Sequence, residues 1–132
     1  MIAVFHGQPP LPEGRRLVWL DLGCGTGIPA CTVAAANPDI EVWGVDYNPA
    51  HIERARALAG AAGLENCHFV EAGFDLLAAD RQLGPAEVDV FVINGVYSWI
   101  AAPQQAAAIS VIGDRLVPGG LAYVMYESPT GW

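Results

Sequence analysis

Lysine is absent from this 132-residue chain, and six arginines stand against fourteen aspartates and glutamates, which gives a formal net charge of −8. A phosphate-binding loop of the pattern G-x-x-x-x-G-K-[ST] needs a lysine, so this class of nucleotide site is excluded. Sequence-independent binding to nucleic acid needs a basic surface that displaces counterions. We therefore expect no nucleic-acid partner, and no membrane partner either, because anionic lipid repels an acidic surface.

Long apolar runs and paired cysteines are missing as well. No stretch approaches the ~20 apolar residues of a membrane span, and the first residues lack the basic start and apolar core of a signal peptide. The three cysteines are odd in number and have no C-x-x-C spacing, which indicates neither a disulfide framework nor a metal site. These absences favour a cytoplasmic protein. With 53% hydrophobic residues, the chain can build the core of one domain.

Short apolar runs alternate with helical segments along the chain. The apolar runs predict five strands, at 17–22, 42–46, 67–70, 88–93 and 121–126. The segments between them predict helices at 30–36, 49–62, 76–82 and 103–116. The last helix has an expected buried stripe of Gln105, Ile109, Ile112 and Leu116. Right-handed crossovers between such strands give a Rossmann-like, doubly wound α/β sheet of order 3-2-1-4-5, with a ligand at the switch point between strands one and four.

The run LDLGCGTG at positions 20–27 is the most informative part of the chain. It follows a short buried strand and contains three glycines, which permit a tight turn whose backbone N–H groups can approach a ligand. A side chain in place of a glycine would block that approach. We therefore predict a nucleoside-binding turn made of Asp21, Gly23, Cys24, Gly25 and Gly27, with the Cys24 thiol packing behind it.

Asp46 ends the second predicted strand, one helix and one strand after the glycine turn. A carboxylate at that place can accept hydrogen bonds from both hydroxyls of an adenosine ribose. We predict that Asp46 binds the ribose and that the adjacent Tyr47 belongs to the same site. The glycine spacing G-x-G-x-G differs from the G-x-G-x-x-G of dinucleotide sites, which leaves an NAD- or FAD-binding domain as the disfavoured alternative.

The segment DLGCGTG at 21–27 resembles motif I of the class I S-adenosylmethionine-dependent methyltransferases. The segment NGVYSWI at 94–100 resembles the H-G-V-Y-S-W-V signature of the methyltransferase family that carries a separate regulatory domain downstream of its catalytic domain. The segments PGGLAYV at 118–124 and YESPTGW at 126–132 resemble that family's P-G-G-x-A-Y-V and Y-N-x-x-P-G-W endings, with Thr130 inserted or shifted. Residues 3–10 resemble the end of the helix before motif I, so the resemblance spans essentially the whole chain.

This resemblance implies an enzyme that uses S-adenosylmethionine as its cofactor and methylates an acceptor, either a protein or a small molecule. A protein amine is a candidate, because the family includes protein lysine methyltransferases. A non-catalytic nucleoside-binding or regulatory module is the alternative. Class I enzymes usually add two more strands after the fifth. We therefore expect residues 1–132 to be a single methyltransferase domain from a longer protein, with the fifth strand as an exposed edge open to association.

Family members often present an aspartate to the adenine amino group at the end of strand three. Gly73 stands there in this chain, so the N–H and ring of Phe74 are the expected adenine contacts, with Asp75 as an alternative. Asn94 replaces the family's histidine after strand four and offers only neutral hydrogen bonds. The topology places the backbone of Asn94 and Gly95 beside the glycine turn, where we expect it to meet the methionine portion or the methyl group of the donor.

Tyr97 and Trp99 follow directly and are the predicted catalytic residues, in the sense that they position the acceptor. Neither ring is a plausible general base, because the tyrosine pKa is ~10 and indole does not titrate. In an extended chain, two residues separated by one lie on the same side, where both rings could wall the acceptor and exclude water. A helical path would splay them apart.

Overall fold

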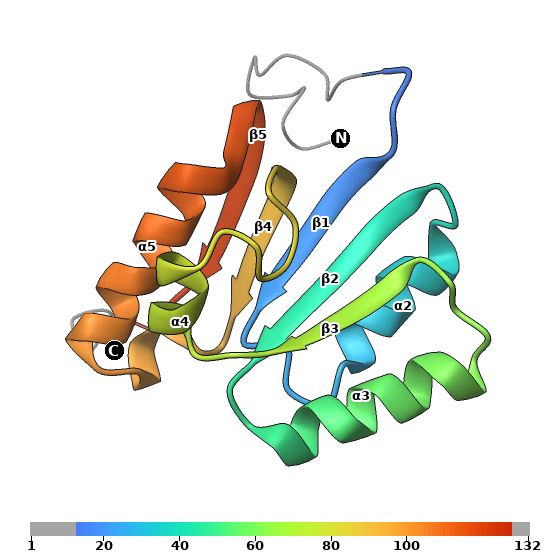
Figure 1. Cartoon of the computed structure of the whole chain (residues 1–132), viewed down its shortest axis with the longest axis horizontal. Coiled ribbons are helices and arrows are strands. Elements are labelled where there is room, and N and C mark those ends of the chain that lie inside the picture. The colour runs from blue at the N-terminus through green and yellow to red at the C-terminus, as the bar shows by residue number, and fades with distance from the viewer. Residues whose placement is uncertain (1–12, 128–132) are drawn as a thin grey trace.

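The computed structural model describes residues 13–127, which form a five-stranded parallel sheet of order β3-β2-β1-β4-β5 (Figure 1). This order confirms the predicted doubly wound α/β fold. The strands are β1 (Leu17–Leu22), β2 (Ile40–Asp46), β3 (Cys67–Glu71), β4 (Val88–Asn94) and β5 (Leu116–Met125).

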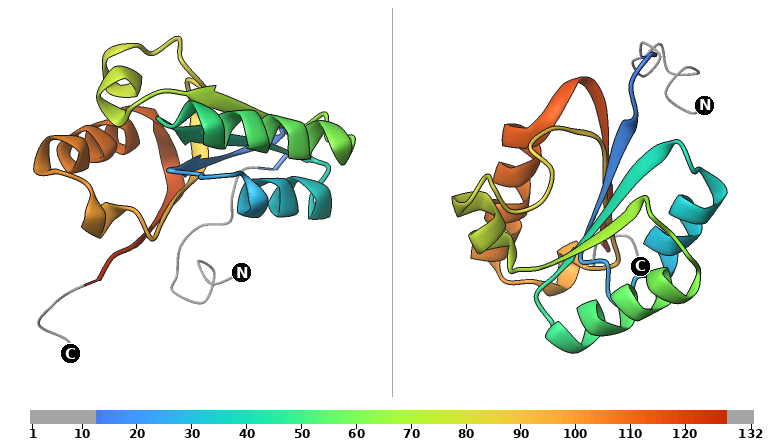
Figure 2. Two further views of the ribbon diagram at one scale, coloured as in Figure 1. Left: turned by 90° about the horizontal axis from the view of Figure 1, so that it is seen from below. Right: turned by 45° about the vertical axis from the view of Figure 1, so that its right-hand side comes forward.

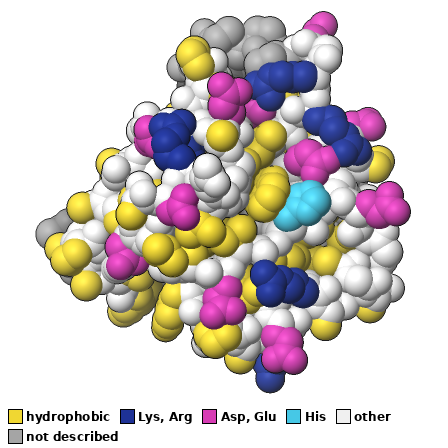
Figure 3. All heavy atoms as spheres, in the orientation of Figure 1, with side chains coloured by type: hydrophobic (Ala, Val, Ile, Leu, Met, Phe, Trp, Pro, Cys, Tyr) yellow, Lys and Arg dark blue, Asp and Glu magenta, His cyan; other side chains and the backbone are white. Residues whose placement is uncertain are grey.

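Two pairs of helices cover the sheet. Helices α2 (Ile28–Ala36) and α3 (Pro49–Ala61) lie together on one face, and α4 (Phe74–Ala79) and α5 (Ala102–Arg115) lie together on the other (Figures 1 and 2). A single 3-10 turn, η1 (Tyr97–Trp99), precedes α5. No helix in residues 13–127 is long and apolar enough to cross a membrane. On the face shown in Figure 3, basic side chains are interspersed with acidic ones.

Each face of the sheet has its own core. Leu20, Leu22 and Phe91 are fully buried on the α4 and α5 side, while Val42 and Ile52 are fully buried on the α2 and α3 side. Residues adjacent in a strand point to opposite faces, which explains the apolar character of β1 on both of its faces. Burial on both faces fixes the register of the central strands and therefore the positions at which they end.

The predicted start of α3 is confirmed in detail. The Asn48 side chain accepts a hydrogen bond from the Ala50 N–H at 3.0 Å, and Pro49 occupies the first helical position. The helix ends before Gly63, whose φ of 66° is in the left-handed region. The Asn48 cap holds the first turn of α3 next to the end of β2.

Two sequence predictions on the α5 side are wrong in detail. Ala108, Val111 and Arg115 form the buried face of α5, whereas Ile109 is 50% exposed. The helical period is as expected, but the buried face is shifted by one residue because small Ala108 packs onto the sheet and polar Arg115 is buried through hydrogen bonds. Strand β5 begins at Leu116 and not at the predicted position 121, so residues 117–120 lie inside the strand, at a shift in its register with β4.

Arg115 is 2% exposed, and its side chain stabilises the loop between α4 and β4. Its Nη1 donates hydrogen bonds to the carbonyls of Leu83 at 2.5 Å and Pro85 at 3.0 Å, and its Nη2 donates to those of Leu77 at 2.7 Å and Asp80 at 3.0 Å. Residues 80–87 contain no helix or strand, so their carbonyls need partners from elsewhere. One guanidinium supplies several of these partners.

Candidate functional site

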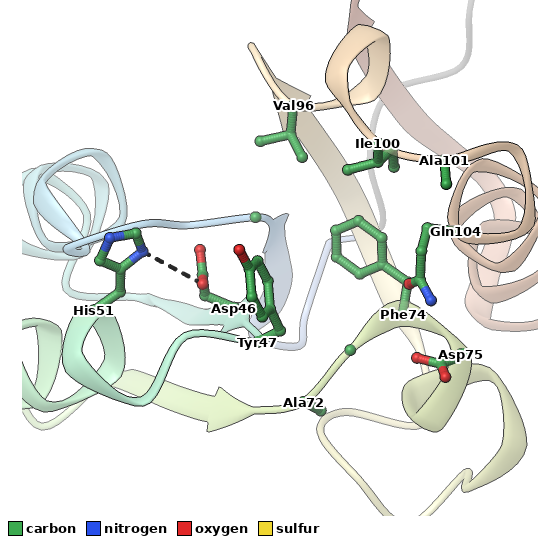
Figure 4. Close-up of a pocket in the computed structure, with 12 residues that line it drawn as sticks. Asp46, Tyr47, His51, Ala72, Phe74, Asp75, Val96, Ile100, Ala101 and Gln104 are labelled. Carbon is green, nitrogen blue, oxygen red and sulfur yellow. Dashed lines mark ion pairs between the residues drawn. The ribbon is translucent and has the colours of Figure 1, made fainter.

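A cavity of about 520 Å³ opens at the carboxyl ends of the strands (Figure 4). Its walls come from the turn after β1, the β2–α3 and β3–α4 junctions, and the loop between β4 and α5. Cofactor sites in proteins usually occupy cavities of ~300–1,000 Å³ at such switch points. Five of the predicted cofactor residues line it: Gly23, Asp46, Tyr47, Gly73 and Phe74.

Asp46 is 7% exposed and anchors the cavity at the end of β2. Its Oδ2 accepts a hydrogen bond from the Gly25 N–H at 2.9 Å, and its Oδ1 accepts one from the Asn48 N–H at 2.8 Å. An ionised carboxylate has about four acceptor sites, so capacity remains for further donors. Asp46 therefore both holds the glycine turn against α3 and presents acceptor oxygens to a ligand.

The three glycines of the turn, Gly23, Gly25 and Gly27, all have positive φ, and their surroundings divide them between two roles. A Cβ on Gly23 would lie 2.7 Å from Val96 Cγ2, and one on Gly27 would lie 2.6 Å from the Ala55 Cβ, so both glycines are needed for close packing. A Cβ on Gly25 would meet nothing within 4 Å. Gly25 and Gly27 do not line the cavity, and Gly25 contributes through its N–H bond to Asp46.

Asp21 and Cys24 lie beneath the turn and outside the lining of the cavity. Burial, assisted by the nearby charge of Asp46, raises the pKa of Asp21 to about 6. Burial also raises the pKa of the Cys24 thiol well above its usual range. A thiol that resists ionisation is a packing group and a poor nucleophile, as the sequence predicted.

The raised pKa of Asp21 predicts how stability depends on pH. The folded protein binds this proton more tightly than the unfolded chain does, so the stability that Asp21 contributes is fully present below pH ~4 and is lost as the pH rises through about 6. At about 1.4 kcal/mol per pH unit, the loss is about 2–3 kcal/mol. We expect Asp21→Asn to recover most of this at pH ~7.5 in urea unfolding and to flatten the dependence between pH ~4 and ~7.5. An unchanged pH dependence in the variant would contradict the assignment.

The β3–α4 junction supplies a second wall. Gly73 precedes the first turn of α4, and the Phe74 ring, 7% exposed, faces the cavity (Figure 4). Asp75, the alternative adenine contact, also lines the cavity, and hydrogen bonds from the Gln104 side chain and the Leu76 N–H lower its pKa. This wall therefore offers an apolar ring beside an ionised carboxylate.

Of the two paths that the sequence left open for the loop after β4, extended or helical, the structure shows the helical one. Gly95 has φ 71°, and the chain then enters η1, with the Trp99 N–H donating to the Val96 carbonyl at 2.9 Å. The two predicted acceptor-positioning rings are splayed apart: Tyr97 packs against the core on the α4 and α5 side, and Trp99 is 74% exposed. Asn94, Gly95, Tyr97 and Trp99 do not line the cavity, whereas Val96 does.

Sequence reasoning missed several lining residues: His51, Ala72, Val96, Ile100, Ala101 and Gln104. His51 lies in the first turn of α3, and its Nδ1 is 3.4 Å from Asp46 Oδ1 (Figure 4). Its place one helical turn after the Asn48 cap was a usable signal, because that face of α3 adjoins the end of β2. Residues 13–127 contain no group of three or more His, Cys, Asp or Glu side chains that could hold a metal ion.

The cavity lies at the switch point between β1 and β4, where doubly wound sheets of this strand order bind their ligands. A family described as "Methyltransferase domain" matches residues 20–122, and the chain belongs to this family. The chain is a class I S-adenosylmethionine-dependent methyltransferase domain. This confirms the enzyme class predicted from the sequence and its cofactor, S-adenosylmethionine. Membership of the branch with a downstream regulatory domain stays a prediction.

Similar proteins include solved structures and curated relatives. PKMT2 from Rickettsia typhi in complex with AdoHcy matches with a TM-score of 0.82 and 28% identity, over 96% of this chain and 24% of that chain. Trans-aconitate 2-methyltransferase of Methylobacterium radiotolerans is 33% identical over 112 residues, 85% of this chain and 38% of the relative. Uncharacterized protein sll1526 of Synechocystis sp. is 32% identical over 118 residues, 89% of this chain and 23% of the relative. The chain thus spans well under half the length of these relatives.

Proposed function

We propose that this chain binds S-adenosylmethionine in the cavity and transfers its methyl group to an acceptor. The observation that carries the proposal is the buried Asp46 carboxylate, which is tied to the glycine turn and also lines a cavity of suitable size. Family membership and the AdoHcy complex of the similar structure support the same ligand.

The residues of the cavity fit this cofactor. Asp46 would accept hydrogen bonds from the ribose hydroxyls, and Tyr47 and Phe74 would contact the adenine. The turn at 23–27, which reaches the cavity through Gly23, and the backbone of Asn94 and Gly95, which directly precedes cavity-lining Val96, would hold the methionine portion. When bound, S-adenosylmethionine supplies an electrophilic methyl group on a sulfonium.

The contribution of the chain to methyl transfer is alignment and the exclusion of water. Positive charge disperses when a neutral nucleophile takes a methyl group from a sulfonium, so no strong acid or oxyanion hole is needed. Val96, Ile100 and Phe74 form apolar walls of the cavity, and such walls favour a dry site. An amine acceptor must arrive unprotonated, which for lysine means working against a pKa near ~10.4.

We further propose that a protein amine is the acceptor and that residues 1–132 are a single domain of a longer protein. The resemblance of residues 94–100 to a family that includes protein lysine methyltransferases supports the acceptor. The short share of the relatives that the chain spans, between 23% and 49% for the first two curated ones, supports the longer protein. A small-molecule acceptor is the competing case, since trans-aconitate 2-methyltransferase is among the relatives.

Calorimetric titration of the full chain with S-adenosylmethionine and AdoHcy tests the cofactor, with NAD as the competing ligand. Transfer of a labelled methyl group into lysine-containing peptides and into small carboxylic acids then tests the acceptor class. We expect binding of both adenosyl ligands, no comparable binding of NAD, and label in the peptides. Donor binding without transfer to any acceptor would favour the non-catalytic module instead.

Tyr97 and Trp99 remain our proposed acceptor-positioning residues, because both belong to the loop that also carries cavity-lining Ile100. We expect Trp99→Ala and Tyr97→Ala to lower methyl transfer at saturating donor while donor affinity stays within a few-fold. Trp99 is the sharper test, because 74% of its side chain is exposed and its loss leaves the core intact. Gly25→Val should instead abolish donor binding, since a β-branched residue at φ 55° is strained and fills the open space beside the turn. Lost donor binding with normal turnover at saturation in Tyr97→Ala would reverse this division of roles.

A further inference from the structure

His51 Nδ1 is the only buried side-chain nitrogen or oxygen without a hydrogen-bond partner in residues 13–127. The atom lies 3.4 Å from Asp46 Oδ1, although the side chain as a whole is 42% exposed and lines the cavity. Figure 4 shows this nitrogen directed at the Asp46 carboxylate. Buried polar atoms are nearly always hydrogen-bonded, so an unpaired one beside a ligand-binding group calls for an explanation.

We propose that His51 is a positioning residue of the nucleoside site and acts by donating a hydrogen bond from Nδ1 to Asp46. This inference rests on the proposed function, because the bound ligand is what makes the orientation of the carboxylate matter. A carboxylate can only accept, so the imidazole nitrogen that faces it carries the proton. Hydrogen bonds of this kind are often long in ligand-free sites and shorten when the ligand binds.

The surroundings of Asp46 show why a third donor is useful. Gly25 N–H and Asn48 N–H each bond one carboxylate oxygen, and both donors belong to segments that border the cavity. His51 is the only basic side chain that lines the cavity in the described part of the chain, while the buried Asp21 carboxyl lies close enough to Asp46 for charge repulsion. A donor from the first turn of α3 offsets this repulsion and restrains the carboxylate, so that its free lone pairs point into the cavity.

His68 provides a matched control. Its Nε2 also lies against a carboxylate, Glu41 Oε2 at 2.7 Å, and its side chain is exposed to a similar degree, 37% against 42% for His51. His68 does not line the cavity. A variant of His68 therefore measures the effect of losing a histidine–carboxylate contact away from the cavity. A variant of His51 measures the effect of losing the contact that faces the ligand.

The experiment is calorimetric titration of the full chain with S-adenosylhomocysteine. We expect His51→Phe, which keeps a ring but no donor, to weaken binding by about 3- to 10-fold. His51→Asn places an amide N–H at the position of Nδ1 and should restore most of this loss. In an Asp46→Ala background, His51→Phe should change the affinity by less than about twofold, because the acceptor through which His51 acts is absent. His68→Phe should leave the affinity unchanged.

Three outcomes overturn the inference. The affinity of His51→Phe can equal that of the wild type, His51→Asn can fail to restore binding in a folded protein, or His51→Phe can cause the same loss with and without the Asp46 carboxylate. A wild-type chain that binds no S-adenosylhomocysteine overturns the proposed function, and this inference with it. Normal wild-type binding with any of the three outcomes overturns the inference alone.

Discussion

Replacing Asp46 by alanine is expected to weaken the binding of S-adenosylmethionine and of S-adenosylhomocysteine by about 10- to 100-fold, because hydrogen bonds to a charged acceptor are worth ~1.5–3 kcal/mol. The substitution removes the acceptor for the ribose hydroxyls. It also releases the Gly25 and Asn48 N–H groups that the carboxylate holds at 2.9 and 2.8 Å. Calorimetric titration of both ligands measures the loss.

Two further variants separate the causes of that loss. Asp46→Asn keeps the shape and an acceptor oxygen but loses the charge, so it should fall between the wild type and Asp46→Ala. Glu53→Ala removes an exposed carboxylate of α3 that does not line the cavity and serves as the control for general negative charge. Unchanged affinity in Asp46→Ala, an equal loss in Glu53→Ala, or preferential binding of NAD would contradict the assignment of the ribose site.

The fold and one half of the cavity could be predicted from the sequence because local rules determine them. The glycine turn and Asp46 each directly follow a short apolar strand, and parallel strands with right-handed crossovers bring such strand ends together. Asn48 and Pro49 carry the signals that start α3. None of these inferences needs to know how distant side chains pack.

The other half of the cavity depends on packing between distant segments. Val96 rests on Gly23, which lies more than 70 positions earlier in the chain, and this contact accompanies the 3-10 turn that carries Tyr97 away from Trp99. The pattern Y-S-W fits an extended or a turned path equally well, so the sequence could not decide between them. Gln104 likewise enters the cavity through the orientation of α5, which was predicted one residue out of phase.

The role of Arg115 in stability could not be predicted from the sequence either, because a helical pattern predicts apolar residues on the buried face. We expect Arg115→Ala to lower the free energy of unfolding by about 3–5 kcal/mol, at about 1 kcal/mol for each of four hydrogen bonds to buried or partly buried carbonyls. Arg115→Lys keeps the charge but lacks the planar fork that reaches all four carbonyls, so its loss should be intermediate. Urea unfolding of the full chain measures both.

Arg81→Ala is the matched control for Arg115→Ala. Arg81 is also an arginine at the α4–α5 side of the sheet, but its ion pair with Asp114 is exposed, with side-chain exposures of 56% and 44%. Exposed pairs contribute ~0–1 kcal/mol, so Arg81→Ala should change stability little. A loss in Arg115→Ala no larger than this would show that water or other donors satisfy the carbonyls of residues 77–85. If the loss is as large as expected, the affinity for S-adenosylhomocysteine should fall as well, because the same carbonyls hold α4, whose first residue, Phe74, forms a wall of the cavity.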